Sequence, residues 1–183
     1  MIATIIVIAV VVLLVLWIIS AQRKFVSSEE IVKNAMSQIG VQQSSRWDAL
    51  TGLVELLKSY NEHEYNTLKD VIAARSGITA NSTTAEAQAQ EDLLQQALIQ
   101  VRAISEQYPD IKANTMYTQT MNSVNTYENQ VRTSRMVYND SVTKYNRLVR
   151  QFPDSLAASL LHFKEKDYLK ENKAKSDMPS LKI

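Results

Sequence analysis

An unbroken stripe of apolar side chains between Tyr117 and Phe152 constrains the fold more than any other feature of the sequence. The stripe advances by alternating steps of four and three residues, which keeps side chains on one face of an α-helix. Its positions are Tyr117, Met121, Val124, Glu128, Val131, Arg135, Tyr138, Val142, Tyr145, Val149 and Phe152. The spacing predicts a long helix packed against partner helices, with Glu128 and Arg135 as charges on the packed face, where charges are costly.

A second stripe of the same spacing predicts a helix from about Phe25 to Arg75. Its regular part consists of Ile39, Gln43, Arg46, Leu50, Leu53, Leu57, Tyr60, Glu64, Thr67 and Val71. We expect this helix to bend or loosen at Gly40 or at Thr51-Gly52. We also expect Gly77 to end it in a left-handed cap.

The first residues form an apolar segment that is long enough to cross a bilayer. Ile2–Ile19 carries no charge, Trp17 lies near its end, and Arg23 and Lys24 follow. Eighteen helical residues span roughly 27 Å, close to the hydrocarbon thickness of about 30 Å. A cleaved signal peptide is disfavoured, because the run is long and no basic residues precede it. The positive charges on the C-terminal side predict a short N-terminus outside and a cytoplasmic domain.

Capping residues and prolines divide the rest of the chain. Ser27 with Glu30 has the spacing of a capping box, so a helix either restarts there or continues from the apolar segment. Thr83 with Glu86 predicts the start of a second helix, which Pro109 ends. The helix of the opening stripe should begin near Thr115 and end at Phe152-Pro153. Asp154 or Ser155 should cap a fourth, shorter helix with the apolar face Leu156, Leu160, Leu161 and Phe163.

These elements predict an all-α fold. A transmembrane anchor (residues 1–21) should precede an up-and-down antiparallel bundle of three long helices and one shorter helix (residues 22–171) and a disordered tail (residues 172–183). With only three Gly and three Pro, the chain has few helix breakers. It has no Cys, which excludes disulfides and thiol chemistry, and its net charge of +1 offers no footprint for nucleic acid.

Several motifs together resemble the LemA family of bacterial membrane-anchored helical proteins. The segment 108–114 (YPDIKAN) resembles its inter-helix motif, and 46–50 (RWDAL) gives a looser match. The residues that resemble its third helix are Glu128-Asn129, Arg135, Tyr138-Asn139-Asp140, Val142, Tyr145-Asn146 and Phe152-Pro153. The resemblance covers nearly the whole chain, including the anchor. It implies a helical protein of the bacterial cell membrane with a single N-terminal span.

This chain also departs from the family's pattern. The family usually has paired arginines where Ser45-Arg46 stands, Pro-Asn where Thr51-Gly52 stands, and Gly where His162 precedes Phe163. The family has no agreed biochemical activity. Its members are often encoded beside a membrane zinc metalloprotease, which makes such a protease a possible partner.

The seam charges are the best candidate site residues. Arg46, Glu64, Glu128 and Arg135 lie on packed faces, where each needs a partner. Glu128 and Arg135 are about 10.5 Å apart along their helix, too far for a direct pair. The simplest hypothesis pairs Arg135 with Glu64 across two helices and fixes their register. A functional polar pocket is the alternative.

Other candidate residues favour structural roles. His63, beside Glu62 and Glu64, lacks the Glu-x-x-His spacing of metal sites in helical bundles, and no nucleophile motif surrounds His63 or His162. Tyr-Asn dipeptides occur at positions 60, 65, 138 and 145, and we interpret them as core aromatics with polar rims rather than a ligand groove.

We therefore expect a non-enzymatic, membrane-anchored scaffold or adaptor for other membrane proteins, without catalytic residues, metal, cofactor, small-molecule substrate or nucleic acid. The alternative is a protein that self-assembles and organises or shapes a patch of the bacterial membrane. The first hypothesis predicts a distinct membrane protein partner, such as the metalloprotease, and the second predicts a homo-oligomer.

Overall fold

The computed structural model describes residues 1–60 and 62–170, apart from the side chains of residues 64 and 67. Within them the chain is all-helical, as the sequence predicts. The helices are α1 (Ile2–Lys58), α2 (Glu62–Ala73), α3 (Thr84–Gln107), α4 (Pro109–Ala113), α5 (Thr115–Arg150) and α6 (Asp154–Leu160). The predicted disordered tail, residues 172–183, lies outside the described residues.

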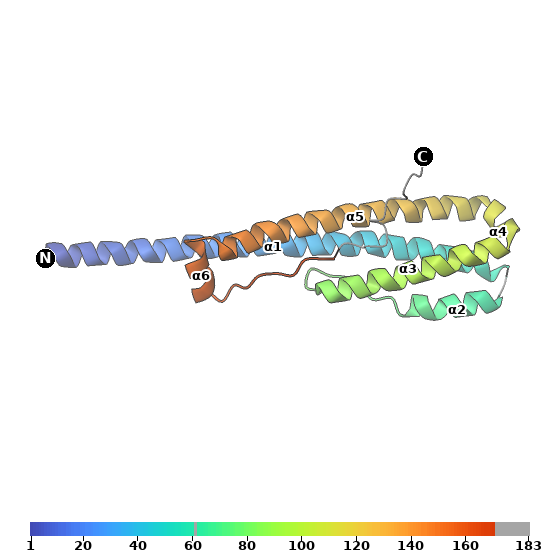
Figure 1. Ribbon diagram of the computed structural model, residues 1–183, viewed down its shortest axis with the longest axis horizontal. Coiled ribbons are helices and arrows are strands. Elements are labelled where there is room, and N and C mark those ends of the chain that lie inside the picture. Colours follow the sequence, from blue (N-terminus) through green and yellow to red (C-terminus); the bar gives the residue numbers. More distant parts are fainter. Residues whose placement is uncertain (61, 171–183) are drawn as a thin grey trace, which may run out of the picture.

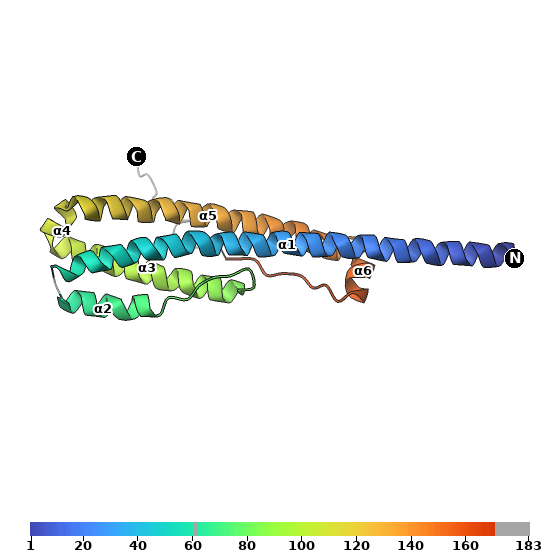
Figure 2. The ribbon, with the colours of Figure 1, turned by 180° about the vertical axis from the view of Figure 1, so that it is seen from behind.

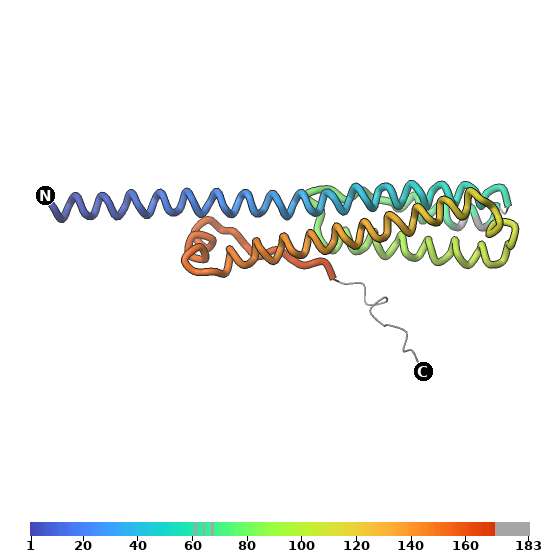
Figure 3. The backbone as a smooth tube through the Cα atoms, turned by 90° about the horizontal axis from the view of Figure 1, so that it is seen from above, coloured from blue at the N-terminus to red at the C-terminus, as the bar shows by residue number. Residues whose placement is uncertain are grey.

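The molecule is a long rod built on α1 (Figures 1 and 2). The N-terminal part of α1 projects beyond the bundle, and α5 lies antiparallel beside the remainder. At the end of the bundle away from the N-terminus, which we call the far end, α2 folds back along α1, and α3 lies beside both. Helix α6 lies across the rod near the point where α1 leaves the bundle, and residues 163–170 run back along the rod from there (Figures 1 and 3).

The apolar segment and the first helix of the bundle form one continuous helix. No break occurs near Ser27 and Glu30, so of the two alternatives the helix continues out of the apolar segment. Among the described residues α1 alone is long and apolar enough to cross a membrane, and its apolar window has no buried residue. At 1.5 Å per residue, α1 is about 86 Å long.

The far end of the first helix differs from the prediction. The helix expected to reach Arg75 ends at Lys58, and the chain turns back into α2. The turn brings Leu68 (1% exposed) into the core beside Trp47 and Leu50, whereas a straight helix would carry Leu68 beyond its packing partners. The left-handed cap predicted at Gly77 is also wrong, because no described glycine has a positive φ.

The other predicted boundaries are mostly confirmed. Thr83 and Glu86 form the capping box of α3. Pro109 follows the end of α3, and the side chain of Asn114 caps α5. The cap predicted for α6 is wrong, because Pro153 precedes this helix without a side-chain hydrogen bond.

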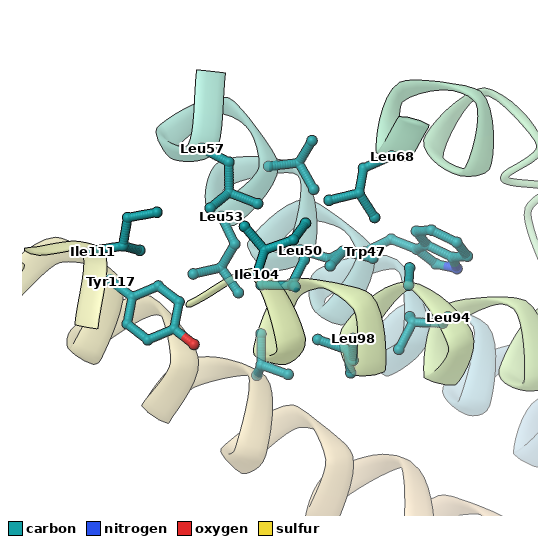
Figure 4. Packing of buried hydrophobic residues seen from close by; sticks show 14 residues of the cluster. Trp47, Leu50, Leu53, Leu57, Leu68, Leu94, Leu98, Ile104, Ile111 and Tyr117 are labelled. Atoms are coloured by element: carbon teal, nitrogen blue, oxygen red, sulfur yellow. The ribbon is translucent and has the colours of Figure 1, made fainter. Parts of the chain in front are cut away.

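Three apolar clusters follow one another along the rod. The largest, at the far end, joins α1, α2, α3, α4 and α5 (Figure 4). The middle cluster packs Met36 and Ile39 of α1 against Tyr138 and Tyr145 of α5, together with Leu169. The third, around Ala21 and Phe25, holds α6 against α1. The predicted stripe of α5 runs through the first two clusters, with Tyr117, Val124, Val131, Tyr138, Val142 and Tyr145 buried.

Gly40 is a close contact between elements rather than the predicted bend. Helix α1 runs through it without interruption, but a Cβ at Gly40 would lie 2.1 Å from the backbone oxygen of Ile78. The connection between α2 and α3 can therefore approach α1 only because the position carries no side chain. Gly52 differs, because a Cβ there would meet nothing within 4 Å.

The two glycines predict opposite effects of the same substitution. Gly40→Ala should destabilise the protein by about 1–3 kcal/mol, because the backbone at Ile78 must move. Gly52→Ala should stabilise it by about 0.5–1 kcal/mol, because alanine is the better helix former. Denaturant unfolding of the full chain in detergent, followed by circular dichroism, measures both. Equal effects of the two variants would contradict the close contact.

Candidate functional site

A buried ion cluster lies at the centre of the far half of the rod. Arg46 of α1 is fully buried. Its Nη1 donates to Glu91 Oε1 of α3 at 2.9 Å, and its Nη2 donates to Glu128 Oε2 of α5 at 3.2 Å. One guanidinium therefore joins three helices, and its planar fork of N–H donors suits two acceptors in different directions.

Amides complete the cluster around Glu91. Gln95 Nε2 donates to Glu91 Oε1 at 3.0 Å, and Gln43 Nε2 approaches Glu91 Oε2 at 3.4 Å. Three buried polar atoms nearby on α1 have no hydrogen-bond partner among the described residues: Gln43 Oε1, Arg46 Nε and Trp47 Nε1. Each carboxylate lies on a different helix, so the cluster is suited to holding α3 and α5 in register on α1.

The sequence identifies two of these three charges. Arg46 and Glu128 are recognisable as seam charges that need partners, and the structure pairs them with each other. Glu91 was missed, although one further step back along the apolar stripe of α3, from Leu94, reaches it. Extended to the N-terminus of α3, the same stripe identifies Glu91 as a third charge on a packed face.

The predicted pair of Arg135 with Glu64 stays a prediction, because the Glu64 side chain lies outside the described residues. Arg135 itself donates to Gln88 Oε1 of α3 at 2.8 Å and to the backbone oxygen of Lys170. Its guanidinium therefore links α5 to α3 and to the C-terminal segment.

Two of the Tyr-Asn dipeptides hold the segment 163–170 against α5. Asn146 donates to the backbone oxygen of Lys166 at 2.9 Å and accepts from its N–H at 2.8 Å. Asn139 does the same for Leu169, with both distances 3.0 Å. An amide side chain can satisfy one backbone donor and one acceptor at once. Seven residues apart, the two asparagines lie on one face of α5 and bind the backbone of an extended chain. We call Asn139 and Asn146 the asparagine grip.

The tyrosines of the same dipeptides pack under that segment. Tyr138 donates to the backbone oxygen of Asp167 at 3.1 Å, and Lys166 Nζ lies 5.8 Å from the centre of the Tyr145 ring. Burial, aided by the charge of Glu29, raises the pKa of Tyr145 to about 12. Burial, with a smaller effect from Asp167, raises the pKa of Tyr138. Both phenols are therefore neutral and packed at physiological pH.

The remaining features offer little chemistry. A shallow hollow of about 480 Å³ lies between α1 and α5, lined by Gln42, Thr126, Asn129, Gln130, Thr133 and Ser134. None of these side chains is an acid, a base or a charged group at neutral pH. Among the side chains that the structure describes, no three His, Asp or Glu are placed to hold a metal ion.

The family comparison agrees with this architecture. The family model described as the LemA family matches residues 35–182. The chain belongs to the LemA family. The matched region includes the whole ion cluster and the asparagine grip, whereas the apolar segment lies outside it. A search of curated proteins gives no match. The LemA match therefore establishes the kind of protein without supplying a reaction.

The ion cluster predicts an unequal cost for two arginine substitutions. Arg46→Ala should destabilise the protein by about 3–5 kcal/mol, because it leaves buried carboxylates without their counter-charge. Arg75→Ala is the control: Arg75 is partly exposed, pairs with the exposed Asp48 at 2.6 Å and donates to Ser44, so the loss should be smaller, about 1–2 kcal/mol. Thermal or denaturant unfolding compares the two, and similar losses would contradict the structural role of the cluster.

The asparagine grip predicts selective release of the C-terminal segment. Asn139→Ala together with Asn146→Ala removes four hydrogen bonds to the backbone of Lys166 and Leu169. Each is worth about 0.5–1.5 kcal/mol, so tryptic cleavage at residues 164–170 should accelerate at least about tenfold. Asn122→Ala, at an exposed asparagine of the same helix, is the control. Unchanged cleavage in the double variant would show that the grip contributes nothing.

Proposed function

We propose that this LemA-family protein is a non-enzymatic, membrane-anchored scaffold or adaptor for other membrane proteins. The observation that carries the proposal is the continuity of α1. One helix contains both the apolar segment and the core residues Trp47, Leu50, Leu53 and Leu57. A partner docked on the bundle would therefore be held at a fixed height above the bilayer.

The dimensions suit a spacer. From Ile19 to Lys58, α1 rises about 59 Å. Helix α5 lies beside α1 along the bundle, and buried clusters at three levels resist bending. The far end, with α2 and α4, is the surface a rigid rod would present to a partner.

The charges support a structural role over an enzymatic one. Among the described residues, the charged side chains Arg46, Glu91 and Glu128 are buried or nearly so, and they are engaged with one another or with amides. A catalytic acid or base needs access to a substrate. The shallow hollow offers such access but is lined by uncharged polar side chains.

The orientation belongs to the same proposal. Arg23 and Lys24 are exposed immediately after the apolar segment. Basic residues close to a span favour the cytoplasmic side, so we place the short N-terminus outside and the bundle in the cytoplasm.

A single-cysteine experiment tests partner and orientation together, because the natural chain has no cysteine. Lys112→Cys marks α4 at the far end. We expect a membrane-permeable cysteine-to-any-residue cross-linker to capture a distinct membrane protein in cells, and an impermeant maleimide to leave the cysteine unmodified. Permeabilised cells are the control, because the cysteine at position 112 should react there with the impermeant reagent.

Two outcomes would contradict the proposal. A ladder of homo-oligomers without another protein would favour self-assembly that organises the membrane. Reaction of the impermeant maleimide with the cysteine at position 112 in intact cells would reverse the orientation.

A further inference from the structure

Helix α6 lies at the near end of the bundle, the end from which the apolar segment of α1 projects. It presents its large apolar side chains to the outside. The sequence predicts Leu156, Leu160, Leu161 and Phe163 as the core-facing side of α6. The structure buries Ala157 and Ala158 instead and leaves Leu156 and Leu160 59% and 62% exposed. Phe152, in the turn before α6, is 75% exposed. The prediction about this face is therefore wrong for Leu156 and Leu160, and the exposed apolar surface needs a partner.

Packing fixes the level of α6 along α1. Ala157 and Ala158 form one cluster with Ala21 and Phe25, and Trp17 packs against it. Phe163, just after α6, stacks on Phe25 with 4.9 Å between ring centres. The apolar segment ends at Ile19, so this cluster contains residues from both sides of the end of the predicted span.

The direction of α6 suits a membrane surface. Figure 1 shows α6 running transverse to α1 at the end of the bundle nearest the N-terminus, and Figure 3 shows it to one side of α1. If α1 crosses a bilayer, a helix lying across it at the level of residues 17–25 lies close to the plane of the interface. Interfacial helices bind there by burying one apolar face among headgroups and the first methylene groups.

The charges around this end fit an anionic bilayer. The exposed basic side chains here are Arg23, Lys24, Arg147, Arg150 and Lys164. Three acidic side chains around this end each have a basic partner: Asp154 is 3.7 Å from Lys24, Glu165 is 3.8 Å from Arg150, and Glu29 is 2.6 Å from Lys166. The exposed Glu30 lies further along α1. The other basic side chains, Arg23, Arg147 and Lys164, are placed to meet lipid phosphates. Their long stems allow the charged groups to reach the headgroups.

We propose that Phe152, Leu156 and Leu160 form a second membrane contact, through which the near end of the bundle rests on the bilayer that α1 crosses. The contact rests on the proposed anchoring by α1. It gives the rod two points of attachment, one through the bilayer and one on its surface. Two points fix the tilt of a rod and its rotation about its own axis, which a single helix leaves free.

The test uses the full chain reconstituted in vesicles of phosphatidylcholine and phosphatidylglycerol. An environment-sensitive fluorophore is attached to a single cysteine, introduced as Leu160→Cys or as Ile99→Cys. These positions have matched exposure, 62% and 63%, and Ile99 lies on α3. Lipids carrying a quencher near the glycerol should quench the label at position 160 several-fold more than the label at position 99, and iodide in the water should do the reverse.

A second comparison separates insertion from mere proximity to the surface. The label is placed at Phe152→Cys, and Leu156→Ser with Leu160→Ser is added. Both leucines are exposed, so Ala157 and Ala158 keep their packing. Lipid quenching of the label at position 152 should fall several-fold in this variant and stay constant when Ile99→Ser is added instead. Equal quenching with and without the leucines would overturn the proposal.

Two further measurements separate a failure of the second contact from a failure of the anchor and from contact with a second copy. A label at Leu13→Cys should be quenched by lipids with the quencher deep in the acyl chain. If the label at position 13 is quenched and the label at position 160 is not, the anchor holds and the second contact is wrong. If neither is quenched, the anchoring itself is wrong. If protection of the position 160 label from iodide disappears when the protein is diluted in lipid, a second copy covers this face and the proposal is overturned.

Discussion

The far half of the rod depends on the neutralisation of one buried charge. Arg46 lies on α1 where a leucine would otherwise fit the stripe, and its charge is tolerable there only with carboxylates in reach. The two it contacts come from α3 and α5. An apolar contact permits a helix to slide by a turn, whereas this arrangement works only when Arg46, Glu91 and Glu128 are at the same level. The cluster therefore selects one register for three helices.

The sequence predicts most of the elements because their signals are local. The stripe of α5 identifies six buried positions, and the Thr83–Glu86 box identifies the start of α3. The pairing of charges could not be read in the same way, since it depends on how far each helix rises beside the others. Residues 59–61 include no proline or glycine, so the sequence predicts that the helix continues. The turn is favoured by the burial of Leu68, with Tyr65, Val71 and Ile72 packed against the same cluster, and that gain exists only in the folded bundle.

His162 shows how a departure from a family pattern acquires a physical meaning. The family usually has glycine there, and the backbone of His162 has φ 61°. A side chain in this left-handed region costs about 1–2 kcal/mol, which glycine avoids. The strained turn lets the chain leave α6 and place Phe163 on Phe25. The apolar spacing predicts Phe163 on the face of the helix itself. It packs after the helix has ended, which that spacing alone could not reveal.

The near half of the rod solves a different packing problem. There α3 contributes only Ala87 to the apolar cluster, and α1 and α5 would expose the edges of Tyr138 and Tyr145 if nothing else covered them. The segment 163–170 supplies the cover, with Leu169 in the apolar cluster and its backbone held by Asn139 and Asn146. An extended chain cannot satisfy its own backbone groups as a helix does, so it needs polar partners from the surface beneath. The Tyr-Asn repeat provides both the apolar floor and those partners. It also ties α6 to the middle of the rod, because the segment that it holds begins at α6 and ends beside Arg135.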